Sequence, residues 1–470
     1  MHPLLATDQT NLAALTAAAR DVAMDFLQRL PSDVPAARPT PMSSASELPP
    51  IDSNHGIGAA AALHQFETAW LPRLAGSAGP RYLGFVTGGA TPASVVGDWL
   101  TSAVDQNPQS HWDSDAPELE RKTVRALTDW FNVPSHDGAF VTGATMSNFV
   151  GLAIAREWVG DQHGVDISHD GLCGLGRIAI YSARPHSSIH KAASMLGLGR
   201  AAVTSVPVLP HREAMDVSAL EVQLALAPET ASIVVATLGT VNSGDFDDIP
   251  ALLALREKYT FWLHVDGAFG AFAALDKRLQ HLVAGLDGAD SICIDCHKWL
   301  NVPYDSAIQL TRRRDLQVRV FSNAAASYLG AIGTNPSFVH LTPENSRRWR
   351  ALAAWFAITA YGRDGHADIV VRNVDGARAL GARIETELGH VLRLLAPVRL
   401  NIVLFTFVNE AAANEASMLD LLQRLRDTGE AFMTPTCYDG TWAMRAAFSN
   451  WQTTAADVDR VFAALRRVVD

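Results

Sequence analysis

The segment SICIDCHKWLNVPYDS, residues 291–306, joins a run of β-branched and apolar residues to Lys298, which follows a histidine and precedes a tryptophan. Lysine is rare in this chain: of its 38 Lys and Arg residues, five are lysines, at positions 122, 191, 258, 277 and 298. A lysine that acts as a Schiff-base nucleophile needs a partly desolvated setting and a rigid strand end that aims its amine. The segment offers both features, although a surface lysine just past a strand end would give the same local pattern.

Short runs rich in β-branched and apolar residues alternate with amphipathic stretches of helical length. The runs are residues 177–182, 231–240, 261–269 and 291–296. Strands that are apolar on both faces and are linked by helices favour a mainly parallel sheet with helices on both sides. The sequence therefore predicts an α/β fold for the large central part of the chain.

The pattern divides the chain into three predicted domains. Residues 1–92 begin with helical periodicity and continue into a Pro- and Ser-rich arm, whereas residues 93–365 hold the alternating strands and helices. Residues 366–470 are expected to form a smaller C-terminal α+β domain. Its predicted helices cover 366–388, 417–428 and 453–470, and its predicted strands cover 400–408 and 442–449.

Composition and charge indicate which partners the protein is expected to lack and in which compartment it is expected to lie. The formal net charge is -11 at pH 7, and basic residues cluster only in short arginine runs at 312–314 and 347–350, which argues against a nucleic-acid partner. No apolar run reaches the ~18 residues that span a bilayer, and no signal-peptide pattern opens the chain, so we expect no membrane partner and a cytoplasmic location. Cys293 and Cys296 form a CxxC without a second pair, so we expect core residues and no metal site.

A second chemical feature is Asp266, in the predicted strand FWLHVDGAF, residues 261–269. A buried carboxylate without a partner costs several kcal/mol, so it should have a cationic partner. A protonated pyridine nitrogen would supply this cation, and the carboxylate would keep that nitrogen protonated. An aspartate that pairs with an arginine or caps a helix is the structural alternative. We expect His264 to lie on the opposite face of the strand and to be structural.

Two further segments could bind parts of a cofactor. In FVTGATMSNFVGLAIAR, residues 140–156, a strand ends at Gly143 and a helix begins near Met146, so free backbone N–H groups and the Thr145 hydroxyl could bind an anion. In SARPHSSIHKAA, residues 182–193, His186 follows a strand and opens a helix, where an imidazole could stack on a ring. An ordinary helix cap and a polar loop histidine are the alternatives.

The motifs acquire specificity from their order. They are GATMSN (143–148), PHSSIHKA (185–192), GTVNSGDFDDI (239–249), LHVDGAF (263–269) and DCHKWLNVPYDS (295–306). Together they resemble the group II pyridoxal-phosphate-dependent amino-acid decarboxylases, the family of the aromatic-L-amino-acid and glutamate decarboxylases, from about residue 80 to the C-terminus. The resemblance implies a fold type I enzyme, similar to aspartate aminotransferase, that binds pyridoxal 5'-phosphate.

The same resemblance implies a homodimer with its active site at the subunit interface. A physical observation agrees with this expectation, because the apolar helix and arm in residues 1–50 lack an obvious partner within one sheet domain. We therefore expect this N-terminal segment to be exchanged across a two-fold axis.

The resemblance also implies a role for each matching residue. Lys298 would hold the cofactor as an internal aldimine, and Asp266 would pair with the pyridine nitrogen. Ala268 and His186 would sandwich the ring. Asn242 would reach the phenolic oxygen, although Val241 stands where some relatives carry a hydroxyl residue. The phosphate would be bound by Ala144, Thr145 and His297.

The implied reaction is decarboxylation of a small-molecule L-amino acid to the amine and CO2, through an external aldimine and a quinonoid. The final proton donor would be Tyr328, thirty residues after Lys298 in a Gly-, Ala- and Ser-rich loop that closes over the neighbouring subunit's site. Relatives with phenylalanine at this place tend to release aldehydes through oxygen-dependent chemistry, so Tyr328 favours simple decarboxylation. An ordinary loop tyrosine is the alternative.

Residues from both the N-terminal and the C-terminal parts of the chain are expected to line the substrate pocket. In RYLGFVTGGATP, residues 81–92, Phe85 and Thr87 resemble pocket residues, whereas Gly84 stands where aromatic-specific relatives have a tyrosine. Arg445 matches a family arginine near the active site. It could hold the substrate carboxylate or make a structural ion pair.

The choice of substrate stays open in the sequence. Across the dimer, Gln106 and Asn107 would make the pocket more polar or roomier than that of the animal aromatic enzymes. An aromatic amino acid is the first expectation, with glutamate, diaminobutyrate or valine as alternatives. An aldehyde synthase or an aminotransferase would use the same lysine and aspartate. A catalytically silent pyridoxal-phosphate fold that only binds is the alternative from another class.

Overall fold

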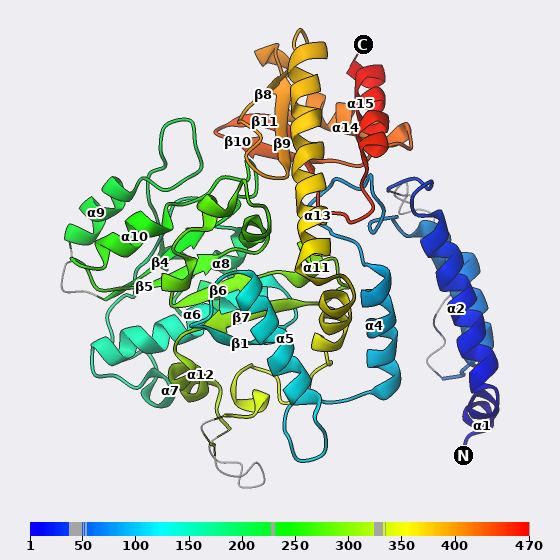
Figure 1. Ribbon diagram of the computed structural model, residues 1–470, viewed down its shortest axis with the longest axis horizontal. Helices are drawn as coiled ribbons and strands as arrows, with labels where there is room; N and C mark the ends of the chain where they lie inside the picture. The colour runs from blue at the N-terminus through cyan, green and yellow to red at the C-terminus, as the bar shows by residue number, and fades with distance from the viewer. Residues whose placement is uncertain are drawn as a thin grey trace.

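The computed structural model describes residues 1–36, 49, 51, 54–226, 231–323, 332–333 and 335–469. A large α/β body surrounds a seven-stranded sheet, a smaller body surrounds a four-stranded sheet, and the N-terminal helices lie to one side (Figure 1). The predicted α/β fold with a mainly parallel sheet is confirmed.

The large sheet has the strand order β1-β7-β6-β5-β4-β2-β3. Neighbours from β6 to β3 are parallel, whereas β7 runs antiparallel to both β6 and β1. The carboxyl ends of β1, β2, β4, β5 and β6 therefore lie along one edge. The bounds are β1 (Asp137–Val141), β2 (Ile180–Ser182), β3 (Val203–Ser205), β4 (Ser232–Thr237), β5 (Phe261–Asp266), β6 (Ser291–Ile294) and β7 (Ala307–Thr311).

Helices cover both faces of this sheet because its central strands are apolar on both sides. In β4, Ile233 and Val235 pack in the core on the side of α6 and α8, while Val234 and Ala236 face the core shared with α5, α10 and α13. This alternation is the period of two that a strand imposes on its side chains. The helices are α4 (Pro92–Val104), α5 (Ala116–Trp130), α6 (Ala144–Gln162), α7 (Ile167–Asp170), α8 (Ser187–Met195), α9 (Val217–Ala225), α10 (Ile249–Leu255), α11 (Cys296–Trp299), α12 (Arg314–Phe321) and α13 (Ala351–Glu387).

The smaller sheet is antiparallel throughout, with the order β10-β11-β9-β8. Helix α13 connects the two bodies, and its backbone leaves the helical region at Gly362, where φ is 60°. The predicted domain boundary after residue 365 lies close to this break and stays a prediction. The elements are β8 (Leu392–Leu394), β9 (Ile402–Phe407), β10 (Thr434–Tyr438), β11 (Thr441–Ala447), α14 (Glu415–Asp427) and α15 (Ala455–Val469).

The N-terminal arm packs little against the rest of the chain. Helices α1 (Pro3–Thr10), α2 (Leu12–Arg29) and α3 (Ala59–Gln65) contain no buried residue, and every residue of these three helices is described. Figure 1 shows α1 and α2 at the edge of the molecule. None of the helices in the described part of the chain is long and apolar enough to cross a membrane.

The arginine runs form ion pairs with acidic side chains of the same chain. The pairs are Arg313–Asp315, Arg314–Asp137, Arg347–Glu120, Arg348–Asp98 and Arg350–Asp305. In the fully buried pair, Arg347 Nη2 donates to Glu120 Oε1 at 2.9 Å. Arg347 Nη1 also donates to the Phe140 carbonyl at 3.1 Å, and the Phe140 N–H donates to Glu120 Oε1 at 3.0 Å. The pair therefore ties β1 to α5.

Arg347→Met should lower the free energy of unfolding by about 3–5 kcal/mol, because it leaves the Glu120 carboxylate buried without a cation. Arg348→Met is the matched control, since its pair with Asp98 is partly exposed and should be worth less than about 1 kcal/mol. Urea unfolding followed by tryptophan fluorescence measures both. Equal losses in the two variants would contradict this interpretation.

Candidate active site

A cavity of ≈ 250 Å³ lies at the carboxyl edge of the large sheet. This edge is where open α/β sheets bind ligands. The lining includes eight residues that the sequence singles out: Phe85, Ala144, His186, Asp266, Ala268, His297, Lys298 and Arg445. The other lining residues are Val86, Thr237, Gly239, Val241, Phe269 and Tyr304. The chain thus brings most of the predicted site into one space.

Lys298 is held by a turn that is clamped from two sides. It belongs to the short helix α11, directly after β6, and the adjacent Trp299 is fully buried. Trp299 Nε1 donates to Asn373 Oδ1 at 2.8 Å. On the other side, a Cβ at Gly88 would lie 1.6 Å from the Lys298 carbonyl oxygen, so only glycine fits there. Trp299 therefore packs in the core and fixes the end of the strand.

The Lys298 amine has a buried carboxylate beside it. Lys298 Nζ lies 3.2 Å from Asp295 Oδ2 and 5.7 Å from the centre of the Phe269 ring. Burial raises the pKa of Asp295, but Lys298 and His297 lower it more, so the net pKa is below its usual value. Asp295 is therefore an ionised partner of the lysine. The sequence shows Asp295 three residues before Lys298, but its role depends on the fold of the turn.

Asp266 ends β5 and is buried. Its Oδ1 accepts from the Ala268 N–H at 3.2 Å, and its Oδ2 accepts from Asn148 Nδ2 at 2.9 Å. His264 also contacts Asn148, with its Nε2 2.9 Å from Asn148 Oδ1. The expectation that His264 faces away from Asp266 is therefore wrong, because residues two apart on a strand share a face.

The N-terminus of α6 opens beside the cavity. Ala144 is its first residue, and the first backbone N–H groups of a helix have no partner within it. Ala144, Ala268 and Cys293 pack together as a floor of small side chains. Thr145 follows in the same turn but is not among the residues that line the cavity. The helix end can bind an anion through its N–H groups and dipole.

His297 lies against this helix end, since a Cβ at Gly143 would be 3.2 Å from His297 Cε1. Both ring nitrogens already have protein partners. Nδ1 accepts from the Ser306 N–H at 3.1 Å, and Nε2 lies 3.1 Å from Asp295 Oδ1. A phosphate contact from His297 would have to replace one of these partners.

Asn242, predicted to reach the phenolic oxygen of the cofactor, does not line this cavity, whereas Thr237 does. Asn242 lines a neighbouring cavity, where Nδ2 donates to Glu213 Oε1 at 3.0 Å and Oδ1 accepts from Thr436 Oγ1 at 2.6 Å. Thr237 ends β4 directly opposite Asp266, and its buried hydroxyl has no hydrogen-bond partner among the described residues. Sequence reasoning missed Thr237; the signal that could have identified it is a hydroxyl residue at the end of a buried strand.

Arg445, on β11, brings a cation into the cavity from the small sheet. Its Nη1 donates to the Phe85 carbonyl at 3.2 Å and its Nε donates to the Val241 carbonyl. Burial lowers the pKa of Arg445 to about 10. The nearby Glu213 carboxylate opposes this lowering of the pKa, but within the described ranges no carboxylate lies at ion-pair distance from Arg445. A negatively charged group of a ligand would therefore stabilise this guanidinium.

Tyr304 is a lining residue that sequence reasoning missed. Its ring lies 4.3 Å from that of His297, between ring centres. Desolvation of its hydroxyl, together with the nearby Asp295 carboxylate, raises the pKa of Tyr304 to about 12. The phenol therefore stays protonated at neutral pH.

Besides Thr145 and Asn242, three predicted residues do not line this cavity in the single chain. Gln106 Nε2 donates to the Val104 carbonyl at 2.8 Å, and Asn107 Oδ1 accepts from the Arg347 N–H at 3.2 Å. Thr87 is partly buried next to the lysine turn but does not line the cavity. Tyr328 lies outside the described residues. The roles of these residues stay predictions.

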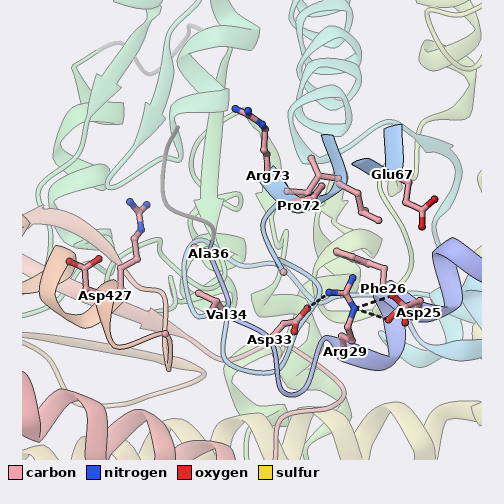
Figure 2. Close-up of a pocket in the computed structure, with 15 residues that line it drawn as sticks. Asp25, Phe26, Arg29, Asp33, Val34, Ala36, Glu67, Pro72, Arg73 and Asp427 are labelled. Carbon is pink, nitrogen blue, oxygen red and sulfur yellow. Dashed lines mark hydrogen bonds and ion pairs between the residues drawn. The ribbon is translucent and has the colours of Figure 1, made fainter. Parts of the chain in front are cut away.

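A larger cavity of ≈ 770 Å³ lies between the N-terminal arm and the end of α14. Figure 2 shows Arg29 within it, with dashed lines to Asp25 and Asp33, at 3.3 Å and 3.5 Å. It contains none of the strand-end residues described above. The chemistry of this chain therefore belongs to the smaller cavity.

The smaller cavity has the groups that pyridoxal 5'-phosphate requires. They are an amine, a carboxylate fixed at a strand end, a floor of small side chains for a flat ring, an open helix N-terminus and an unpartnered hydroxyl. Each part of the cofactor can thus meet a complementary group.

Comparison with known proteins agrees with this chemistry. The pyridoxal-dependent decarboxylase conserved domain matches residues 61–408. An aromatic-L-amino-acid decarboxylase of Bacillus atrophaeus is 26% identical over 407 residues, which cover 83% of this chain and 81% of the relative. An L-2,4-diaminobutyrate decarboxylase of Rhizobium meliloti is 29% identical over 388 residues, which cover 80% and 75%.

The fold is also shared with a solved structure. The crystal structure of Oryza sativa TDC with PLP and tryptamine has a TM-score of 0.90 at 22% identity, and the match covers 100% of this chain and 99% of that chain. The family match spans most of the chain and includes the lysine, the aspartate and the helix N-terminus. The chain belongs to the pyridoxal-dependent decarboxylase family and is a pyridoxal-phosphate-dependent amino-acid carboxy-lyase.

Proposed function

We propose that this enzyme converts an L-amino acid to its amine and CO2, with Lys298 as the residue that binds the cofactor and Asp266 as the partner of its pyridine nitrogen. One observation carries the proposal: the Lys298 amine and the Asp266 carboxylate line one cavity from neighbouring strand ends, beside the N-terminus of α6. When bound, pyridoxal phosphate supplies a ring that accepts the electrons of the breaking bond.

The other residues of the cavity hold the cofactor in this proposal. The N–H groups at Ala144 and Thr145 bind the phosphate, while Ala268 and His186 lie on either face of the ring. The unpartnered Thr237 hydroxyl takes the role at the phenolic oxygen that the sequence assigned to Asn242. Support for this exchange is that the Asn242 amide is already bonded to two protein groups.

The substrate carboxylate is proposed to bind Arg445, which is buried, cationic and has no carboxylate at ion-pair distance in the described chain. The rest of the lining favours an aromatic side chain, because Phe85 and Tyr304 both face the cavity. The names of the relatives include both aromatic and diaminobutyrate decarboxylases. A second amino group would need a carboxylate, and the only one in the described lining is Asp266, which has its own partners.

We propose that the active enzyme is a homodimer with the cavity at the interface. An apolar stripe of α4 is exposed in the single chain: Val96, Trp99, Leu100 and Val104. Spacings of three and four residues put these side chains on one helix face. The stripe directly precedes Gln106 and Asn107, the residues expected to reach the neighbouring site. The exposed apolar residues of the N-terminal helices, Leu5, Leu12 and Met24, are the other part of the proposed interface.

Val96→Asp should weaken the dimer at least ~10-fold and lower decarboxylation in parallel, because it places a charge in the apolar stripe. Val222→Asp is the matched control, since Val222 is another exposed valine, on α9, at 66% exposure against 49% for Val96. Sedimentation velocity across a concentration series measures the association. A wild-type enzyme that is fully active as a monomer would contradict the proposal.

The product panel is the direct test of the reaction. Purified enzyme with pyridoxal phosphate should release CO2 and amine in equal amounts from an aromatic L-amino acid, with no ammonia or peroxide. Diaminobutyrate, glutamate and valine complete the panel, and Lys298→Ala serves as the inactive control. Aldehyde, ammonia and peroxide as the main wild-type products would show an aldehyde synthase instead. No product from any amino acid would favour a binding protein.

Tyr328→Phe, assayed in the same panel, tests the proton donor. The variant should bind the cofactor as the wild type does but divert product from amine to aldehyde. An unchanged ratio would move the proton donor elsewhere. Tyr304 would then be the next candidate, since its phenol is protonated and lines the cavity.

A further inference from the structure

A chain of hydrogen bonds runs from the buried core under β5 to the cavity. Trp262 Nε1 donates to Ser291 Oγ at 2.9 Å, and Ser291 Oγ lies 2.7 Å from His264 Nδ1. His264 Nε2 lies 2.9 Å from Asn148 Oδ1, and Asn148 Nδ2 donates to Asp266 Oδ2 at 2.9 Å. Trp262, Ser291, His264 and Asn148 are all buried. The last member of the chain is the carboxylate that lines the cavity.

The protonation state of His264 and the acceptor oxygen of Asn148 determine which atom donates in each of these hydrogen bonds. Burial lowers the pKa of His264 to about 4, so the ring carries one proton at neutral pH. Asn148 Oδ1 can only accept, so that proton is on Nε2. His264 Nδ1 therefore accepts from the Ser291 hydroxyl, which in turn accepts from the Trp262 indole N–H. From Trp262 to Asn148, each residue thus donates its hydrogen bond to the next one along the network.

Asn148, whose oxygen is held by His264, donates hydrogen bonds to two groups. Its amide nitrogen donates one hydrogen to Asp266 and the other to Ser188 Oγ, which lies at 3.0 Å. A rotated amide would place its oxygen against the Asp266 carboxylate and lose the bond from His264. All of the hydrogen-bonding capacity that faces these neighbours is used, so the amide has one favourable orientation.

The branch through Ser188 fixes the histidine at the cavity. His186 Nδ1 lies 2.7 Å from Ser188 Oγ and accepts from the Ser188 N–H at 3.2 Å. Since Nδ1 accepts, the neutral ring of His186 carries its proton on Nε2. Ser188 Oγ can accept from Asn148 and donate to His186 at the same time. The Ser188 backbone N–H alone fixes this tautomer, and Asn148 adds a bond to the Ser188 hydroxyl that contacts the imidazole.

Gly151 permits the close approach that makes the chain possible. It lies three residues after Asn148, on the same face of α6. A Cβ at Gly151 would be 2.6 Å from His264 Cε1 and 2.8 Å from His264 Nδ1. The helix and the strand can approach to this distance because Gly151 has no side chain.

We propose that Asn148, oriented by His264, is a positioning residue that fixes Asp266 and His186 together. This inference rests on the cofactor-binding roles proposed above. The two groups would meet different parts of one ring, Asp266 at the nitrogen and His186 at a face. One amide thus holds the carboxylate directly and the imidazole through the Ser188 hydroxyl. A purely structural network would stabilise the fold without affecting either group.

The test compares variants of the full-length protein after removal of the cofactor. Asn148→Leu and His264→Leu should weaken pyridoxal phosphate binding about 10- to 100-fold, because each removes buried hydrogen bonds to or toward a charged group. His264→Gln should recover most of the affinity, since its amide N–H can donate to Asn148. Ser147→Ala is the matched control: Ser147 is buried in the same helix but donates to the Ile308 carbonyl. It should change the affinity less than about 3-fold.

A second measurement does not depend on the cofactor. In protein labelled with ¹⁵N-histidine, the wild type and Ser147→Ala should show one protonated and one unprotonated ring nitrogen for His186, with the proton on Nε2. Asn148→Leu should keep this tautomer but shift the His186 ring ¹⁵N signals, because the Ser188 hydroxyl that contacts Nδ1 loses its bond from Asn148. If Asn148→Leu does not fold, the His264→Leu and His264→Gln pair decides the same point.

The outcomes separate the inference from the proposed function. If the wild type does not bind pyridoxal phosphate, the proposed roles fail whatever the variants do. If the wild type binds it and Asn148→Leu binds equally well with unchanged His186 ring signals, the positioning role is wrong. A loss of thermal stability without a change in affinity or in the His186 ring signals would show a structural network only.

Discussion

The buried carboxylate of Asp266 is the constraint around which the site is built. A carboxylate at the end of a central strand must be compensated, because an unpaired buried charge costs several kcal/mol. The chain supplies two hydrogen bonds, from Asn148 and from the Ala268 N–H, but no described cation pairs with it. In the role proposed for Asp266, a protonated pyridine nitrogen would supply the missing positive charge. The unpaired carboxylate would then contribute to the affinity for the cofactor.

The rest of the fold holds the amine at a fixed position relative to this carboxylate. Asp266 and Lys298 follow adjacent parallel strands, so the sheet register sets their separation. Trp299 anchors the lysine turn in the core, and Gly88 lets the segment from the N-terminal part of the chain press against its other side. Arg445 comes from the small sheet. Four distant parts of the sequence thus converge on one cavity, and the site depends on the packing of the two bodies.

The sheet, Lys298 and Asp266 could be predicted from the sequence because they depend on local patterns: apolar strands and the polar residues that end them. Contacts between segments that are distant in the sequence could not be predicted in this way. Gly88 has no signal until the lysine turn lies against it, and Asn148 looks like one more polar residue in the first turns of a helix. His264 was placed on the wrong face although the period of two was sufficient to place it correctly. Thr237 replaces Asn242 at the cavity because the loop after β4 turns the amide toward Glu213.

The central claim is that Lys298, alone among the lysines, carries the cofactor. Borohydride reduction of the enzyme loaded with pyridoxal phosphate makes that bond permanent, and digestion with mass spectrometry locates it. The account predicts a phosphopyridoxyl group on the peptide that contains Lys298 and none on Lys122, Lys191, Lys258 or Lys277. Labelling of another lysine in the wild type, or equal labelling of Lys298→Ala, would contradict it.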